Sequence, residues 1–279
     1  MSAAALEQRL DALTAVDTPP ASEARAAVDE LLHALEAGSV RAAQRHDDGW
    51  RVNAWVKRGI LLGFRIGENH ASHAGDVLHF RDRDTFPTWD PASAGRDVRI
   101  VPGGSSVRRG AYLGDGVVMM PPAYVNVGAW VDAGTMVDSH ALVGSCAQVG
   151  RGVHLSAAAQ LGGVLEPIGA LPVIVEDGAF IGGGCGVYEG TRVGAGAVLA
   201  PGVVLTASVP IFDLERETVL RAAGGSPLVI PAGAVVVPGA RGATGRFAAE
   251  HGLQLQTPLI VKYRDPGTDA ALALEEALR

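Results

Sequence analysis

An aliphatic residue recurs at every sixth position through the middle of the chain. The register runs unbroken from Val107 to Leu161 and resumes from Val175 to Ile211. Its members are Val107, Leu113, Met119, Val125, Val131, Val137, Val143, Val149, Leu155, Leu161, Val175, Ile181, Val187, Val193, Leu199, Leu205 and Ile211. A fixed six-residue period predicts a solenoid, in which each short unit buries its apolar side chain against its neighbours. A β-sandwich instead places turns about every 8–12 residues, so we expect stacked coils.

A second column of residues supports the same interpretation. Four positions after each aliphatic residue stands a small or β-branched one, as at Ala111, Val117, Ala123, Ala129, Thr135, Ala141, Ala147, Val153, Ala159, Ala179, Cys185, Thr191, Ala197 and Val203. A glycine often precedes it, where a turn requires a backbone conformation that side chains disfavour. The chain has 37 glycines and only 5% aromatic residues, a composition that calls for many such turns.

The period divides the chain into three parts. We expect a mainly β protein, with a parallel β-helix domain over residues 99–245. Val175 follows Leu161 by fourteen positions rather than twelve, which predicts a loop insertion near residues 162–174. A second break, from about 214 to 228, precedes a final coil at Ile230 and Val236. Loops that leave a solenoid lie on its surface and often carry function.

The flanking parts show helical and strand patterns. Residues 1–98 predict an α/β cap domain, with one helix from Ser22, as its N-cap, to Gly38 and an amphipathic segment near residues 54–64. Residues 246–279 predict a small extension, in which residues 254–263 form a strand and Thr268 opens a terminal helix.

Composition excludes several classes of function. The formal net charge is −7 and no Lys/Arg run stands out, so we expect no nucleic-acid partner. No stretch approaches the ~18 apolar residues of a membrane span, and Glu7 and Arg9 interrupt the N-terminal segment. We therefore expect a cytoplasmic protein without a membrane partner. The histidines lack metal-ligand spacing, so we expect no metal, and Cys146 and Cys185 are interpreted as buried thiols.

Specific segments resemble the tetrahydrodipicolinate N-succinyltransferase family. They are DGWRVNAWVKRGILLGFRI in the cap, VRIVPG at the entry to the solenoid, PAYVNVGAWVDAGTMVDSHALVGSCAQVGRGVHLS, the loop GGVLEP and the late coil IPAGAVVVPG. The resemblance covers the chain from about residue 25 to its final helix. It implies a left-handed parallel β-helix, a homotrimer with active sites between subunits, and transfer from succinyl-CoA to tetrahydrodipicolinate in the diaminopimelate and lysine pathway.

The resemblance also implies roles for individual residues. Asp138, in GTMVDSH, matches a substrate-contacting and proposed catalytic aspartate, and Arg99 matches an arginine that holds a substrate carboxylate. Glu166 and Gly163 fall in the loop that resembles a cover over the coenzyme. The chemistry agrees, because an attacking amine must lose its proton to a base and arginine binds carboxylates. Asp138 could instead be a corner aspartate that caps its own backbone.

Three positions depart from the family pattern. Gly184 and Gly186, in FIGGGCGVYEG, stand where the family has an arginine and a proposed catalytic glutamate, and Pro210 replaces another arginine. Glu189 or Glu166 could supply the acid–base group with Asp138, so that the reaction survives. Alternatively, the site takes a different amine or acyl group. A catalytically silent subunit kept for binding or assembly is a third hypothesis.

Four further residues have two interpretations each. Arg241 and Arg246 lie in the glycine-rich stretch PGARGATGRF, where they could bind the phosphates of the coenzyme or be surface side chains. His140 and His154 could act as bases, although a structural role is favoured for both.

Overall fold

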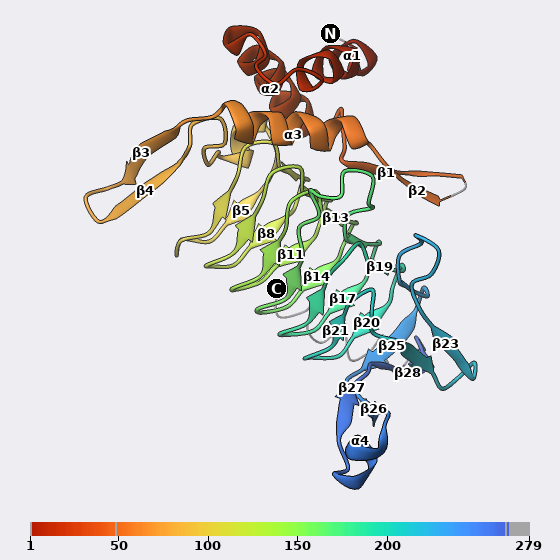
Figure 1. Cartoon of the computed structure of the whole chain (residues 1–279). Helices are drawn as coiled ribbons and strands as arrows, with labels where there is room; N and C mark the ends of the chain where they lie inside the picture. The colour runs from red at the N-terminus through yellow and green to blue at the C-terminus, as the bar shows by residue number, and fades with distance from the viewer. Residues whose placement is uncertain (1, 48, 266, 268–279) are drawn as a thin grey trace.

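A short cap, a tapering stack of coils and a projecting arm make up the protein (Figure 1). The structure is a computed structural model that describes residues 2–47, 49–265 and 267. Helices α1 (Ala3–Thr14), α2 (Ala21–Glu36) and α3 (Ala54–Ile66) lie together at one end of the coils. The predicted mainly β architecture with a parallel β-helix is confirmed, whereas its handedness stays a prediction of the resemblance.

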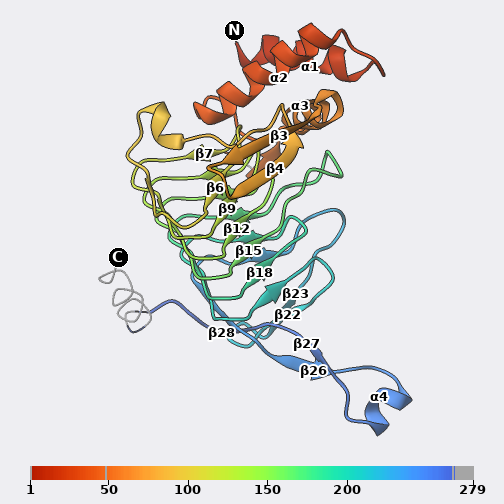
Figure 2. The ribbon, with the colours of Figure 1, turned by 90° about the vertical axis from the view of Figure 1, so that its left-hand side faces the viewer.

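Three parallel sheets form the faces of the solenoid. Face 1 holds β5 (Arg99–Ile100), β8 (Val118–Met119), β11 (Met136–Val137), β14 (His154–Leu155), β17 (Phe180–Ile181), β20 (Val198–Leu199) and β25 (Ala234–Val237). Face 2 holds β6 (Ser106–Val107), β9 (Tyr124–Val125), β12 (Leu142–Val143), β15 (Gln160–Leu161), β18 (Gly186–Val187) and β21 (Val204–Leu205). Face 3 holds β7 (Tyr112–Leu113), β10 (Trp130–Val131), β13 (Gln148–Val149), β16 (Ile174–Val175), β19 (Arg192–Val193) and β24 (Val229–Ile230). In Figure 2 the labels β6 to β18 descend one face in sequence order.

Each two-residue strand sends its second residue inward and its first residue outward. The predicted aliphatic column is buried from Val107 to Val236, and the small column lies in the same core. Strands pair with the strand three further along the chain, as Val131 pairs with Val149. The corner glycines have the expected left-handed backbone, with φ of 70° at Gly134 and 64° at Gly196.

Two excursions interrupt the coils. Residues 162–173 join β15 on face 2 directly to β16 on face 3. Adjacent strands are normally six positions apart, so this loop adds eight residues rather than the two that we predicted. The second excursion follows β21 and forms β22 (Ile211–Asp213) and β23 (Thr218–Leu220) before β24. Ile211 keeps the register and is buried, but β22 pairs with β23 and β28 instead of continuing the coil.

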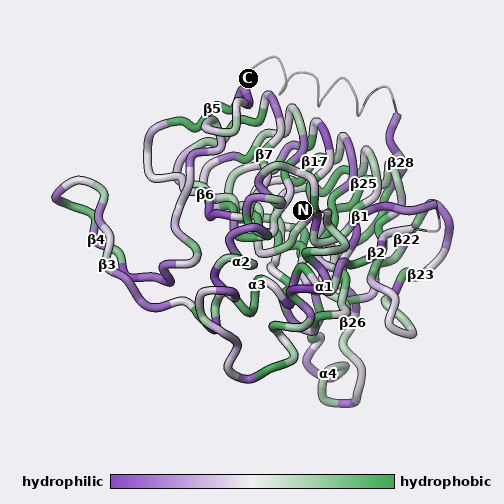
Figure 3. Tube along the Cα trace, turned by 90° about the horizontal axis from the view of Figure 1, so that it is seen from above, coloured by the Kyte–Doolittle hydropathy of each residue, from purple (hydrophilic) through white to green (hydrophobic). Residues whose placement is uncertain are grey.

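The cap contains elements that the sequence patterns did not predict. Helix α1 was missed, and so were the hairpins β1 (Ala43–His46) with β2 (Gly49–Val52) and β3 (Asn69–Ala74) with β4 (Leu78–Arg83). Seen from above, β3 and β4 project away from the coils (Figure 3). The predicted N-cap was wrong, because α2 begins at Ala21 after Pro20 and Ser22 lies in its first turn. A single turn, η1 (Pro91–Ala94), precedes β5.

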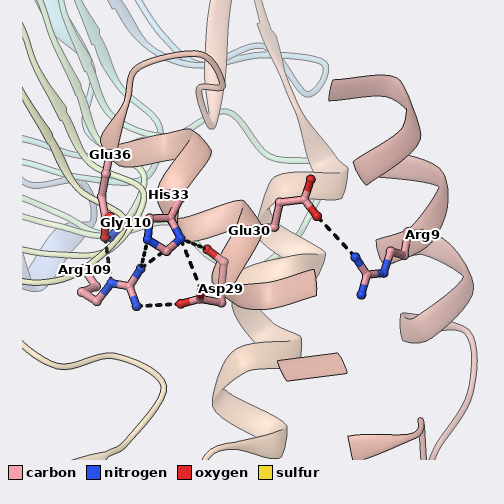
Figure 4. Close-up of polar contacts among 7 residues, drawn as sticks. All are labelled: Arg9, Asp29, Glu30, His33, Glu36, Arg109 and Gly110. Atoms are coloured by element: carbon pink, nitrogen blue, oxygen red, sulfur yellow. Dashed lines mark hydrogen bonds and ion pairs between the residues drawn. The ribbon is translucent and has the colours of Figure 1, made fainter. Parts of the chain in front are cut away.

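Hydrogen bonds and ion pairs of Arg109 link helix α2 to the first coil (Figure 4). Its Nε donates to Glu36 Oε1 at 3.0 Å and its Nη1 donates to Asp29 Oδ1 at 2.7 Å. The same Glu36 oxygen accepts the backbone N–H of Gly110 at 2.8 Å. The Glu36 carboxylate is nearly buried, and it accepts hydrogen bonds from both Arg109 and Gly110. This contact between the cap and the solenoid therefore leaves no unpaired acceptor at Glu36 Oε1.

A projecting arm lies at the opposite end of the stack from the cap (Figure 2). It contains β26 (Ala240–Gly242), α4 (Arg246–Glu250) and β27 (Gln254–Gln256), with β26 and β27 antiparallel. The predicted strand over residues 254–263 is therefore two strands, β27 and β28 (Leu259–Tyr263), and β28 returns to face 1. The predicted helix from Thr268 lies outside the described residues. The domain boundaries at 98/99 and 245/246 stay predictions.

Candidate active site

Asp138 lies at an edge of the solenoid between face 1 and face 2. It follows β11, and its half-buried carboxylate accepts the backbone N–H of Ser139 through Oδ1 at 2.7 Å. Asn126 and Asp132 make the same contact at other corners, each at 2.8 Å. The turn contact that we considered for Asp138 is therefore real. It occupies one carboxylate oxygen, so the second can still take part in proton transfer.

Glu189 lies at the next edge, between face 2 and face 3. It is exposed and has a φ of 54°, and it is followed by Gly190 with a φ of 71°. Its Oε2 accepts the backbone N–H of Ala207, one coil further on, at 2.7 Å. The carboxylate is thus held in place by a backbone donor while it remains open to solvent.

The predicted loop leaves the solenoid at this same edge. Gly163 stands at its root, where its backbone nitrogen would be 2.3 Å from a Cβ placed on Gly144. Glu166 is exposed further along the loop. Lys57, a fully buried residue of α3, donates from Nζ to the carbonyl oxygen of Ala170 at 2.6 Å. Burial lowers the pKa of Lys57, because the charged amine loses its hydration.

A groove of about 690 Å³ runs beside Glu189. Its walls come from β2, the loop, the corners after β18 and β21, and the second excursion. The lining residues are Trp50, Arg51, Val52, Gly169, Ala170, Leu171, Glu189, Gly190, Ala207, Ala222, Ala223, Gly224, Gly225, Ser226 and Pro227. Five segments of the sequence therefore enclose one open site with both a cation and a carboxylate in its lining.

The remaining candidate residues lie elsewhere in the chain. Arg99 is exposed on face 1, in the first strand of that sheet. Arg241 and Arg246 belong to the arm, where Arg246 is largely exposed and pairs with Glu250 at 3.4 Å. The structure thus brings together Glu189 and residues 169–171 of the loop, but it leaves Asp138, Arg99 and the two arm arginines on other parts of a single chain.

The cysteines are buried, as predicted. Burial raises the pKa of Cys146 to about 12, which leaves its thiol protonated at neutral pH. Burial also raises the pKa of Cys185. His154 is buried against Phe180, with ring centroids 4.8 Å apart, whereas His140 is exposed at a corner. Within residues 2–47 and 49–265, His, Cys, Asp and Glu side chains form no group that could hold a metal ion.

Sequence reasoning missed three residues at this edge. Trp50 and Arg51 reach the groove on a hairpin whose short strands gave no clear pattern. Lys57 was quoted within a resembling segment but received no role. Its signal was available, since it is one of only two lysines and stands in the apolar helix AWVKRGILL. A lysine among core residues rarely lacks a partner.

Comparisons with known proteins agree with this geometry. Residues 5–66 match the N-terminal domain of tetrahydrodipicolinate N-succinyltransferases, and residues 172–207 match the hexapeptide repeat of succinyl-transferases. A 2,3,4,5-tetrahydropyridine-2,6-dicarboxylate N-succinyltransferase from Paramagnetospirillum magneticum is 42% identical over the whole of both chains. Relatives with the same name are 43% identical in Polynucleobacter asymbioticus (92% of this chain, 90% of the relative) and 40% identical in Acinetobacter baylyi (99% and 96%).

This chain belongs to the tetrahydrodipicolinate N-succinyltransferase family.

Within this member of the N-succinyltransferase family, the three departing positions have distinct surroundings. Gly184 is a corner residue with a φ of 65° and open space around it. Gly186 lies on face 2 beneath the ring of Tyr188. Pro210 stands in the second excursion, where its carbonyl accepts the hydroxyl of Thr257 at 2.6 Å. No helix of the described residues is long and apolar enough to cross a membrane.

Proposed function

We propose that the protein transfers a succinyl group from succinyl-CoA to the ring-opened amino form of tetrahydrodipicolinate, in the diaminopimelate and lysine pathway. The supporting observation is the groove at the edge between faces 2 and 3. It is bordered by a loop fastened through Lys57 and by the oriented carboxylate of Glu189. Family membership supports the succinyl group and the acceptor, because the name of the relatives states both.

The reaction needs a base and a stabilised oxyanion. The uncharged amine attacks the thioester carbonyl, a C–N bond forms, the C–S bond breaks, and the coenzyme leaves as a thiolate that takes up a proton. In this proposal Asp138 accepts the amine proton and binds the acceptor. Glu189, with Glu166 on the loop, offers further acid–base capacity. Arg99 holds a carboxylate of the acceptor as a charged partner.

The coenzyme belongs along the loop and the arm in this proposal. The acyl-CoA contacts Gly163 at the root of the loop, and Arg241 and Arg246 bind its phosphates. Succinyl-CoA serves as a co-substrate and no metal takes part. A cytoplasmic location and small-molecule partners only, without nucleic acid or membrane, complete the assignment.

The distribution of candidate residues supports a homotrimer with sites between subunits. Asp138 and Glu189 lie at different edges of one solenoid, so both can face one substrate only if edges of two copies meet. A closed ring of identical subunits repeats that contact at each boundary.

Thiol release from succinyl-CoA and from acetyl-CoA, each with and without tetrahydrodipicolinate, tests the proposal. We expect release that depends on the acceptor and on the succinyl donor. Asp138→Asn, which keeps the turn contact to Ser139 but removes the base, should lower kcat by about 10²–10⁴-fold. Acceptor-independent or absent release, with coenzyme still bound, would refute this function and direct the search to other amines.

A further inference from the structure

The ring of Tyr188 lies along face 2 and packs against two glycines, Gly162 and Gly186. Gly186 is two residues earlier, at the start of β18, and Gly162 stands next to Tyr188 in the preceding coil, because Leu161 pairs with Val187. A Cβ on Gly186 would lie 2.4 Å from Tyr188 Cε2, and a Cβ on Gly162 would lie 2.8 Å from Tyr188 Cδ1. No side chain larger than hydrogen fits at either position while the ring is there.

Positions 162 and 186 require glycine because the Tyr188 ring occupies the space of a side chain, and not because of their backbone conformation. Neither Gly162 nor Gly186 has a positive φ, in contrast to the corner glycines such as Gly184 and Gly190. Any residue could adopt the backbone of Gly162 and Gly186. Their lack of a side chain therefore serves the Tyr188 ring, which is held in one orientation by packing on its underside.

The hydroxyl of Tyr188 lies over the start of β18, at 2.9 Å from the Cβ position of residue 186. Tyr188 is partly exposed, and no hydrogen bond links its hydroxyl to any residue in the described part of the chain. Gln160 and Val204 flank Gly186 on face 2, and both are uncharged. A phenol donates an O–H hydrogen bond, so face 2 presents a hydroxyl beside Gly186 to whatever binds there.

Tyr188 also stands next to the groove. Glu189, which lines the groove, is the following residue, and Gly162, against the ring, is the first residue of the loop whose residues 169–171 line the same groove. A ligand that enters the groove and extends toward face 2 passes this hydroxyl.

We propose that Tyr188 is a substrate-contacting residue that donates a hydrogen bond to an oxygen of the acyl group of bound acyl-CoA. The inference rests on the proposed function for the identity of that ligand. An acyl group offers the thioester carbonyl oxygen, which gains negative charge during attack, and succinyl also offers its carboxylate. Tyr188 transfers no proton in this role; it orients the acyl group and stabilises its charge.

The test is Tyr188→Phe, which keeps the ring packed against Gly162 and Gly186 and removes only the hydroxyl. We expect kcat/KM for acyl-CoA to fall about 10-fold or more, the effect of losing a hydrogen bond to a charged oxygen. A loss with both succinyl-CoA and acetyl-CoA assigns the bond to the carbonyl, and a loss with succinyl-CoA alone assigns it to the carboxylate. Unchanged kcat/KM with both donors overturns the proposal.

Two further variants distinguish a contact between the Tyr188 hydroxyl and substrate from a structural role of that hydroxyl. Gly186→Ala should displace the ring and cause a similar loss, but it should add little in the Tyr188→Phe background, because the hydroxyl is already gone. Tyr112→Phe makes the same chemical change under the cap and should leave kinetics unchanged. If Tyr188→Phe instead lowers Tm or changes the oligomeric state, the hydroxyl has a structural partner and the proposal is wrong.

Direct binding of succinyl-CoA by calorimetry keeps this test separate from that of the proposed function. If the wild-type protein binds succinyl-CoA without turnover, the proposed function fails. The inference then stands if Tyr188→Phe weakens binding about 10-fold and falls if the affinity is unchanged.

Discussion

Faces 2 and 3 are built from the same repeat and share one core, yet their outer surfaces differ. On face 3 the cap covers the outward residues: Arg41 lies 3.9 Å from the ring centre of Trp130 and donates to Gln148 at 3.0 Å. Trp50 donates to Glu176, at the corner after this face, at 2.9 Å. On face 2 the outward residues are the uncharged Ser106, Tyr124, Leu142, Gln160, Gly186 and Val204.

This difference separates two demands on a solenoid sequence. Inward positions must be aliphatic on every face, because the core is continuous. The residue type at an outward position depends on what packs against that face. On face 3 this is the cap, and on face 2, in our proposal, it is substrate beside Tyr188. Variants on face 3 should therefore change stability, whereas variants around Tyr188 should change kinetics.

The largest effect is expected where the two faces are equivalent. Leu161→Ala under face 2 and Leu113→Ala under face 3 each remove a fully buried side chain, so each should lower the free energy of unfolding by about 2–5 kcal/mol. Urea titration measures both, with the exposed Leu214→Ala as the control. A large cost on only one face would contradict a shared core.

A smaller effect is expected from the covered face. Arg41→Ala removes the stacking on Trp130 and leaves the buried Gln148 Oε1 without that donor, which should cost about 1–3 kcal/mol. Thiol-release kinetics should stay unchanged at temperatures where the variant is folded. The exposed Arg45→Ala serves as its control, and a kinetic defect in Arg41→Ala alone would show that face 3 takes part in the reaction.

Lys57 joins the cap to the loop between the two faces, and its effect should depend on pH. Burial lowers its pKa in the folded state from the ordinary 10.5, so the unfolded chain binds more protons between the two pKa values. The stability of the wild type relative to Lys57→Met should therefore rise as pH increases through the folded pKa toward 10.5. Urea titrations of both proteins from pH 7 to 10 measure this difference, and a flat difference would mean that Lys57 stays charged in the folded protein throughout, so that its pKa is not lowered.

The smallest effect should come from Thr191, at the corner between faces 2 and 3. Its buried hydroxyl has no hydrogen-bond partner among the described residues, so Thr191→Val should leave the unfolding free energy unchanged or raise it slightly. Thr135 is equally buried at another corner, but its hydroxyl donates to Gly150 O at 2.8 Å and accepts from Val153 N at 3.1 Å.

Thr135→Val is thus the matched comparison and should cost about 1–3 kcal/mol. Thermal unfolding of both variants measures the contrast. Equal losses of Tm would show that the Thr191 hydroxyl has a partner of its own.

The candidate site was predictable only in part. Asp138 and Glu189 were proposed as site residues from their motifs, and the loop was predicted from the interrupted register. The edge to which each belongs could not be read from spacing, because a six-residue unit gives one corner without saying which face it follows. Lys57 and Tyr188 were missed for a related reason: their contacts, to Ala170 and to Gly162, join parts of the chain that no local pattern connects.

The sequence alone determined the core of the solenoid. A strict repeat is compatible only with a stack in which the aliphatic residue of each coil is buried against the neighbouring coil. The sequence also determined α3, whose apolar face is continuous over residues 54–66. Tertiary structure decided the outside: which edge carries Glu189, how far the loop departs, which face the cap covers, and where the ring of Tyr188 lies. Those features depend on contacts between distant segments, whose geometry is set by packing and not by the period of the chain.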